Sequence, residues 1–167
     1  MKTVFWAPVH GQAKQSSNML AVSLMLSMKY KHRVLMTQTQ FRMNDFEDAV
    51  VGRTGAKEFR ERFYQDMGID AVSRCIKRKR LEKEDLENCC VQLLETPELM
   101  LLPSSRSGNY QIHCEALGEI MPYLLCEADK YFDYIMIDTN PGQEYVSNKL
   151  LQSADIVIVN LSQNIGV

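Results

Sequence analysis

A lysine and two serines lie between a short apolar run and a longer helical pattern near the start of the chain. The stretch "APVHGQAKQSSNM" spans residues 7–19 and contains Lys14, Ser16 and Ser17. Backbone N–H groups at the start of a helix bind anions, and a lysine and a hydroxyl placed there can contact phosphate and a divalent cation. Gly11 is the only glycine of the stretch, whereas phosphate-binding loops usually contain more. The stretch therefore predicts either a phosphate-binding loop or an ordinary strand-to-helix turn.

A single aspartate ends a strongly apolar run later in the chain. The stretch "FDYIMIDTNPG", residues 132–142, places Asp138 directly after "YIMI". In phosphate sites, an aspartate at the end of such a strand holds or orients a magnesium ion. We therefore predict Asp138 as a catalytic residue and, together with Ser16, as a Mg²⁺ ligand. The alternative is structural, because Ser16 and its neighbours are good helix N-caps and Asp138 can end a strand before a turn.

Apolar runs alternate with helical patterns along the chain. The apolar runs lack hydrophobic-polar alternation, which is typical of parallel strands covered on both faces. Strands that alternate with helices favour parallel pairing with right-handed crossovers. We therefore expect an α/β three-layer sandwich with a mostly parallel central sheet. The patterns predict strands at 2–7, 33–37, 98–103, 132–139 and 154–161, and helices at 16–29, 56–65, 69–79, 83–94 and 110–128, with Pro122 at a helix start or kink.

Three polar loops follow predicted strands in this arrangement. In doubly wound folds, ligands bind beyond the carboxyl ends of the strands, so these loops are expected to meet at one edge of the sheet. The second loop contains Asp45, Glu47 and Asp48, which we interpret as a solvated loop or a helix start. The three loops are residues 8–18, 38–48 and 138–142.

Composition restricts the class of protein. The 167 residues suit one domain, residues 1–167, and 46% of them are hydrophobic, which is enough for a core. The net charge of −2 argues against a globally basic nucleic-acid binder. Neither a signal peptide nor a membrane-length apolar run is evident, which predicts a cytoplasmic protein. Because the sequence stops just after a core strand, we expect it to be the N-terminal part of a longer chain.

The cysteines do not suggest a metal or catalytic site. Their number is odd and none forms a CxxC pair, which predicts reduced, packed thiols. His113 and Cys114 are neighbours, but adjacent side chains on a helix point about 100° apart, so they do not form a nucleophile–base pair. The five thiols are Cys75, Cys89, Cys90, Cys114 and Cys126.

These motifs, in this order, resemble the MinD/ParA group of deviant P-loop ATPases, the SIMIBI class. The segment "VFWAPVHGQAKQSSNMLAVSLML" is similar to the family's first strand, phosphate loop and helix. "KHRVLMTQTQF" is similar to the second strand, "YFDYIMIDTNPG" to the Walker B strand and switch, and "ADIVIVNLSQN" to the following strand. The resemblance covers nearly all 167 residues and implies ATP and Mg²⁺ as cofactors. It also implies a homodimer or a complex with a partner protein.

The resemblance carries site residues onto this chain but also exposes departures. It implies that Lys14 contacts phosphate and that Asp138 serves the metal. The positions of the family's signature lysine, two loop glycines, magnesium-binding hydroxyl and acidic pair are occupied here by Val9, His10, Ala13, Gln15, Gln38 and Gln40. The implied cofactor-binding residues are Gly11, Gln12, Ala13, Lys14, Gln15 and Ser16.

Losing these charged groups affects hydrolysis more than binding. One missing charged group can reduce phosphoryl transfer on the order of 10³-fold, whereas backbone N–H groups suffice for phosphate contact. We therefore expect a degenerate ATP-binding localisation or assembly switch with weak or absent ATPase activity, acting in plasmid partition, a pilus, conjugation or secretion.

Two other interpretations remain open. The first is a non-catalytic pseudo-ATPase scaffold whose partner surface is residues 74–87; its "KRKR" segment would contact DNA or an acidic membrane surface, or form a solvated face. The second is an unrelated small-molecule enzyme. No GxGxxG follows the first strand, so such an enzyme would bind phosphate alone, at the loop 104–109.

Overall fold

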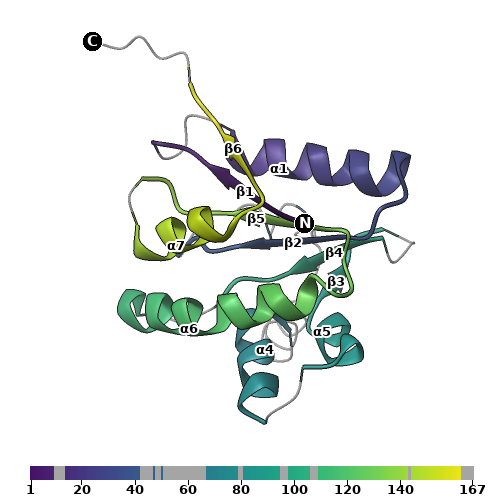
Figure 1. Ribbon diagram of the computed structural model, residues 1–167, viewed down its shortest axis with the longest axis vertical. Helices are drawn as coiled ribbons and strands as arrows, with labels where there is room; N and C mark the ends of the chain where they lie inside the picture. The colour runs from purple at the N-terminus through teal and green to yellow at the C-terminus, as the bar shows by residue number, and fades with distance from the viewer. Residues whose placement is uncertain are drawn as a thin grey trace.

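The computed structural model describes residues 1–9, 14–41, 47, 50, 67–78, 81–94, 98–105, 109–142 and 144–162. In this part of the chain, six strands form one sheet in the order β3-β4-β2-β5-β1-β6 (Figure 1). Every neighbouring pair is parallel except β3 and β4. The strands are β1 (Lys2–Trp6), β2 (Val34–Gln38), β3 (Val91–Gln92), β4 (Leu99–Leu102), β5 (Tyr134–Asp138) and β6 (Ile156–Val159).

Helices cover both faces of the sheet, so the predicted α/β three-layer sandwich is confirmed. The first helix and the π-helix that continues it cover one face of the sheet. The other four described helices cover the opposite face (Figure 1). Apolar side chains alternate between two cores: Phe5 and Met136 face the first helix, whereas Val4 and Ile137 face the other layer. The helices are α1 (Gln15–Leu24), η1 (Met25–Lys29), α4 (Gly68–Lys77), α5 (Lys83–Asn88), α6 (Tyr110–Ala128) and α7 (Tyr145–Ser153).

Local signals set the ends of several helices. Asn109 precedes α6 and its Oδ1 accepts the backbone N–H groups of Gln111 and Ile112, which satisfies two otherwise unpaired donors. At the start of α5, the side chains of Glu82 and Asp85 form a capping box. The helix α6 runs through Pro122, so of the two predicted alternatives, a helix start and a kink, the helix start is wrong.

Other helix predictions are corrected in two places. The helix expected at 83–94 ends at Asn88, and Val91 and Gln92 instead pair with β4 as the antiparallel strand β3, which covers a sheet edge that would otherwise be open. The helix α7 has no counterpart in the sequence prediction. The helix expected at 56–65 lies outside the described residues.

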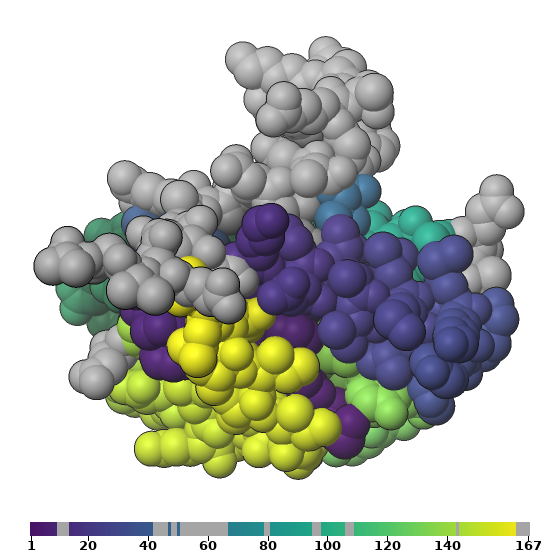
Figure 2. Space-filling view, turned by 90° about the horizontal axis from the view of Figure 1, so that it is seen from above, coloured from purple at the N-terminus to yellow at the C-terminus, as the bar shows by residue number. Residues whose placement is uncertain are grey.

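The strand β6 is less buried than its sequence suggests. Val157 and Val159 have 42% and 51% of their surface exposed, so the prediction that this run is covered on both faces is wrong. The physical reason is its place in the sheet: β6 pairs with β1 on one side and has no described strand on the other. Figure 2 shows this C-terminal segment in yellow, exposed on the surface beside the atoms of α1.

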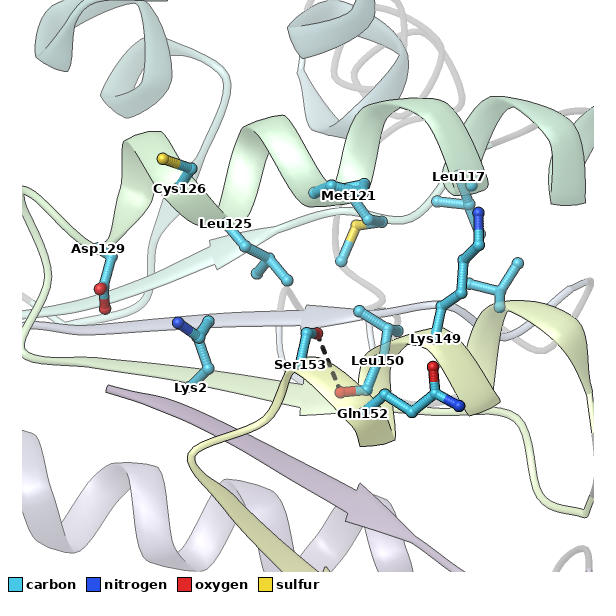
Figure 3. Close-up of a pocket in the computed structure, with 13 residues that line it drawn as sticks. Lys2, Leu117, Met121, Leu125, Cys126, Asp129, Lys149, Leu150, Gln152 and Ser153 are labelled. Atoms are coloured by element: carbon cyan, nitrogen blue, oxygen red, sulfur yellow. Dashed lines mark hydrogen bonds between the residues drawn. The ribbon is translucent and has the colours of Figure 1, made fainter.

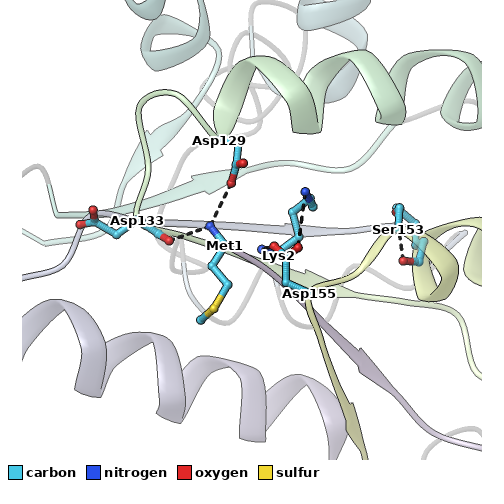
Figure 4. A network of polar contacts seen from close by, with 7 residues as sticks. Met1, Lys2, Asp129, Asp133, Ser153 and Asp155 are labelled. Atoms are coloured by element: carbon cyan, nitrogen blue, oxygen red, sulfur yellow. Dashed lines mark hydrogen bonds and ion pairs between the residues drawn. The ribbon is translucent and has the colours of Figure 1, made fainter.

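Polar contacts connect the start of β1 to neighbouring elements (Figure 4). They lie at the end of the sheet opposite to the loops that follow β1, β2 and β5. The amino group of Met1 donates to Asp129 Oδ1 at 2.9 Å and to the carbonyl of Asp133 at 2.8 Å. The hydrogen bond to the amino group lowers the pKa of the Asp129 carboxyl. The backbone N–H of Lys2 donates to Asp155 Oδ2 at 2.6 Å. These contacts attach β1 to the end of α6 and to the start of β6.

The helices described in the structure include none with the length and apolar character needed to cross a bilayer.

Candidate functional site

Asp138, the last residue of β5, is the centre of the candidate site. Its carboxylate is fully buried and accepts hydrogen bonds from the first two residues of α1. Gln15 Nε2 lies 2.5 Å from Oδ1, and Ser16 Oγ lies 2.5 Å from Oδ2. Gln40, which follows β2, donates to Oδ2 at 3.1 Å. The structure thus brings together Asp138, Gln15, Ser16 and Gln40.

Gln15 holds three elements together through one amide nitrogen. Besides the Asp138 carboxylate, its Nε2 contacts the backbone carbonyls of Phe5 and Thr139, each at 2.8 Å. All three partners are oxygens that only accept hydrogen bonds, so the amide must present its nitrogen and not its oxygen. The side chain therefore ties the start of α1 to the ends of β1 and β5.

Lys14 begins α1 in an unusual backbone conformation. Its φ of 48° lies in the left-handed region, which costs a non-glycine residue about 1 kcal/mol or more and is enriched at functional loops. The Lys14 carbonyl accepts the Asn18 N–H at 2.9 Å, and its side chain is exposed. The predicted position of Lys14, between a buried strand and a helix, is confirmed. Gly11, Gln12 and Ala13 lie outside the described residues.

Gln38 lies beside Asp138 on the neighbouring strand. The two residues are register partners between the parallel strands β2 and β5, so their side chains project to the same face of the sheet, the face covered by α1. Gln38 is fully buried, and no described residue forms a hydrogen bond with either polar atom of its amide. A buried amide without a partner is costly and uncommon, so Gln38 has hydrogen-bonding capacity that no described residue uses.

The donor set at Asp138 does not fit Mg²⁺. This ion requires a near-octahedral shell of oxygen ligands at about 2.0–2.1 Å. Here Gln15 and Gln40 present amide nitrogens to the carboxylate, and the Ser16 hydroxyl donates its hydrogen to the same group. Ser16 and Asp138, the predicted metal ligands, therefore bind each other directly. Among the described residues, no group of three or more His, Cys, Asp or Glu side chains is placed to hold a metal ion.

A hollow of about 600 Å³ lies between the first polar loop and the loop after β5. Glu144, just before α7, organises one side of it by accepting a hydrogen bond from Asn140 Nδ2 at 2.6 Å and another from the hydroxyl of Tyr110. The bond to Glu144 raises the pKa of Tyr110. Val9, where the resemblance expects the signature lysine, is half exposed at this hollow. It is lined by Pro8, Val9, Tyr110, Asn140, Pro141, Glu144 and Tyr145.

Two polar contacts near the site were not predicted. Asn160, directly after β6, accepts a hydrogen bond from Asn18 Nδ2 at 2.7 Å and so connects α1 to β6. A polar residue after an apolar run was the signal that identified Asp138, and the same signal applies to Asn160. Glu47 is fully buried and helical and accepts the Ser104 N–H at 2.5 Å, so of the two predicted alternatives, a solvated loop and a helix start, the solvated loop is wrong for this residue. Asp45 and Asp48 lie outside the described residues.

A second hollow of about 510 Å³ lies away from Asp138, between α6 and α7 (Figure 3). Leu125, Met121 and Leu150 extend into the space between the two helices, and Lys2 and Asp129 lie at one end (Figure 3). Cys126 also lines this groove and is exposed. The prediction of packed thiols therefore holds for the buried Cys89 and Cys90 but not for Cys126.

The fold is shared with solved structures. A ParA family ATPase from Chlorobium tepidum TLS superposes with a TM-score of 0.73 at 20% identity, covering 95% of this chain and 59% of that one. The chain has a ParA/MinD-like fold. The MinC:MinD cell division complex of Aquifex aeolicus gives a TM-score of 0.60 at 14% identity over 95% of this chain and 55% of the other. No family model and no curated protein matches the sequence.

A third ParA/MinD-like neighbour contains a nucleotide analogue. It is a candidate plasmid partition protein from Borrelia burgdorferi B31 bound to AMPPNP, with a TM-score of 0.55 at 19% identity over 96% of this chain and 62% of that one. The chain therefore spans less than two thirds of the length of each of these three neighbours.

Proposed function

We propose that this ParA/MinD-like chain is a degenerate ATP-binding protein that acts as a localisation or assembly switch, with weak or absent ATP hydrolysis. Plasmid partition, pilus assembly, conjugation and secretion are the systems in which we expect it. The similarity to a ParA family ATPase and to an AMPPNP-bound partition protein supports nucleotide binding. The role as a switch rests on the family resemblance.

The observation that carries the proposal is the contact between Asp138 and the start of α1. In this fold, Lys14 is the N-cap of the helix after the first strand, and the side chains of the first two helical residues, Gln15 and Ser16, bond directly to the aspartate that ends β5. A phosphate bound at the start of α1 would lie beside this contact, because helix N-termini attract anions through free N–H groups. Binding and release of phosphate would then be coupled to the loop after Asp138.

Isothermal titration of the purified protein with ATP tests the proposal. We expect binding in the micromolar to millimolar range, and a loss of about tenfold or more in Lys14→Ala, because a charge-assisted contact to phosphate would be removed. Lys29→Ala is the matched control, because it removes the same charge from the far end of the same helical segment and should leave the affinity unchanged. The absence of binding at millimolar ATP would refute the proposal.

A non-catalytic scaffold is the second candidate. It is favoured by the amide side chains at Gln15, Gln38 and Gln40, because amides supply neither a general base nor a charge partner for a metal. A turnover assay separates the two. Phosphate release that disappears in Lys14→Ala supports the weak ATPase, whereas nucleotide binding without turnover supports a nucleotide-bound scaffold.

The proposed partners follow from the same fold. We propose a homodimer or a complex with a partner protein in the cytoplasm, with the hollow at Val9 as part of the contact. DNA or an acidic membrane surface is a further proposed partner for the basic segment near residues 74–80. Sedimentation with and without ATP tests the first proposal, and a sheared-DNA or anionic-vesicle binding assay tests the second.

A further inference from the structure

The described side chains that bond to the buried carboxylate of Asp138 are donors, whereas a divalent cation needs oxygen ligands. We propose that the Asp138 site excludes Mg²⁺ and that phosphate binding at the start of α1 requires no divalent cation. The first half of this proposal stands on the contacts of Asp138 alone. The second half rests on the proposed function, because it assumes that phosphate binds.

The amide of Gln15 occupies the position where a cation would have to act. Its nitrogen lies within 2.8 Å of three acceptor oxygens, which belong to Phe5, Asp138 and Thr139. Rotating the amide to offer its oxygen would place that oxygen against all three acceptors. A cation could enter only if Gln15 moved away and lost its three hydrogen bonds. Two of these go to backbone carbonyls, those of Phe5 and Thr139, at the ends of β1 and β5. The partially positive N–H₂ group therefore does the bridging that a cation would otherwise do.

Two further described donors bond to the second oxygen of the carboxylate. Ser16 and Gln40 both donate to Oδ2, so each carboxylate oxygen already has a partner from the chain. Hydrogen bonds to a carboxylate are among the stronger ones in proteins, and a metal would have to replace them. Mg²⁺ also loses its water shell reluctantly, which makes this replacement harder.

Amides in place of carboxylates also lower the negative charge that a bound phosphate would face. Gln38 and Gln40 are neutral amides that stand beside the carboxylate of Asp138. A phosphate near it would face amide N–H groups and not several negative charges. Gln38 in addition has an amide without a described hydrogen-bond partner at the same face. The ligand class that suits this site is a phosphate or oligophosphate free of divalent metal.

Binding of Mn²⁺, followed by electron paramagnetic resonance, tests the exclusion without nucleotide. We expect wild-type protein to leave millimolar Mn²⁺ free in solution and to show no rise in Tm with it. Binding of Mn²⁺ by wild type that is lost in Asp138→Asn, but kept in the surface control Asp155→Asn, would overturn the proposal. The control is apt because Asp155 sits at the opposite end of the sheet (Figure 4).

A gain-of-binding variant identifies the cause of the exclusion. Gln40→Asp adds a carboxylate at a half-buried position that makes one bond of 3.1 Å to Asp138, so we expect it to fold. Mn²⁺ binding in this variant, and not in the exposed control Gln152→Asp, would attribute the exclusion to the amides. If wild type and Gln40→Asp both leave Mn²⁺ free, the exclusion is still supported and is assigned to Gln15.

Calorimetry with ATP and with inorganic tripolyphosphate tests metal independence. We expect the affinity in EDTA to stay within about twofold of that in Mg²⁺. Binding more than about tenfold tighter in Mg²⁺, equivalent to about 1.4 kcal/mol, would overturn metal independence. If neither anion binds in either buffer, the proposed function fails and metal independence fails with it, while the Mn²⁺ measurement still decides whether Asp138 excludes the metal.

Discussion

Gln15 and Gln38 both lie beside the carboxylate of Asp138, but their amides have opposite surroundings. The amide nitrogen of Gln15 contacts three acceptor oxygens at 2.5–2.8 Å. The amide of Gln38 is fully buried at the register position next to Asp138, and no described residue bonds to it. One glutamine is thus a structural connector, and the other carries unused hydrogen-bonding capacity.

The difference indicates how the two residues contribute to stability and binding. A bonded buried amide stabilises the fold, whereas an unpaired one destabilises it unless a ligand or water supplies the missing partner. Gln15 should therefore matter most for stability and Gln38 most for affinity. Substituting the two residues separately tests this division.

The largest expected effect comes from Gln15→Ala. The substitution removes three contacts and leaves the Asp138 charge and two carbonyls less well paired, so we expect the free energy of unfolding to fall by about 2–4 kcal/mol. Urea denaturation measures the change. Gln152→Ala, an exposed glutamine of α7, is the control and should stay within about 0.5 kcal/mol of wild type.

Gln15→Glu sharpens the same test. It retains the length of the side chain but replaces the donor by a carboxylate that faces three acceptor oxygens. We expect it to be at least as destabilising as Gln15→Ala. A variant as stable as wild type would mean that the amide nitrogen is not what holds these oxygens together.

The second expected effect has the opposite sign. Gln38→Leu replaces an unpaired buried amide by an apolar group of similar size, so we expect the free energy of unfolding to rise by up to about 1 kcal/mol. The affinity for tripolyphosphate should fall severalfold in the same variant, because a donor is lost. A marked loss of stability would show that the Gln38 amide is already satisfied, and the contrast with Gln15 would disappear.

The sequence predicted the sheet and the meeting of its polar loops at one edge because both depend on regular patterns. Apolar runs define buried strands, and the carboxyl ends of parallel strands converge at one edge. The resemblance also identified Gln38 and Gln40 as amides at acidic positions. Neither the sequence patterns nor the resemblance could predict the orientation of each amide group, because the orientation depends on which oxygens surround the amide in the folded chain.

The wrong predictions all concern features that depend on tertiary contacts. The exposure of Val157 and the short strand at Val91 depend on which strands lie at the edges of the sheet, and apolar content alone does not encode this order. The buried carboxylate of Glu47 accepts a hydrogen bond from Ser104, a residue far away in the sequence, and no local pattern encodes this contact. The helix α7 was missed because its apolar positions are few: Val146, Leu150 and Leu151.

A smaller effect is expected at a carboxylate near the surface, which provides a comparison for Asp138. The bond from Met1 lowers the pKa of Asp129, so this contact stabilises the fold above the unfolded pKa of about 3.9 and its contribution is lost as the pH falls through the folded pKa. Asp129 is partly exposed, so we expect Asp129→Asn to cost no more than about 1 kcal/mol at pH 7. Urea denaturation at pH 7 and pH 3 checks this: the cost should shrink at pH 3, and an equal cost at both would contradict it.

The smallest expected effect is on the reactivity of the thiols in the layer of α4–α6. It tests whether the hydrogen bonds of Gln15 stabilise only their own edge of the sheet. Burial raises the pKa of Cys89 to about 12 and that of Cys90 well above its usual value, so at pH 8 both should react slowly with a thiol reagent, whereas the exposed Cys126 should react first. Gln15→Ala should leave this order unchanged under native conditions, because the thiols pack under α4–α6 and not at α1. Mass spectrometry of the labelled protein measures each rate. Labelling of Cys89 as fast as that of Cys126 in Gln15→Ala would mean that the amide of Gln15 supports the whole sheet and not only the edge at Asp138.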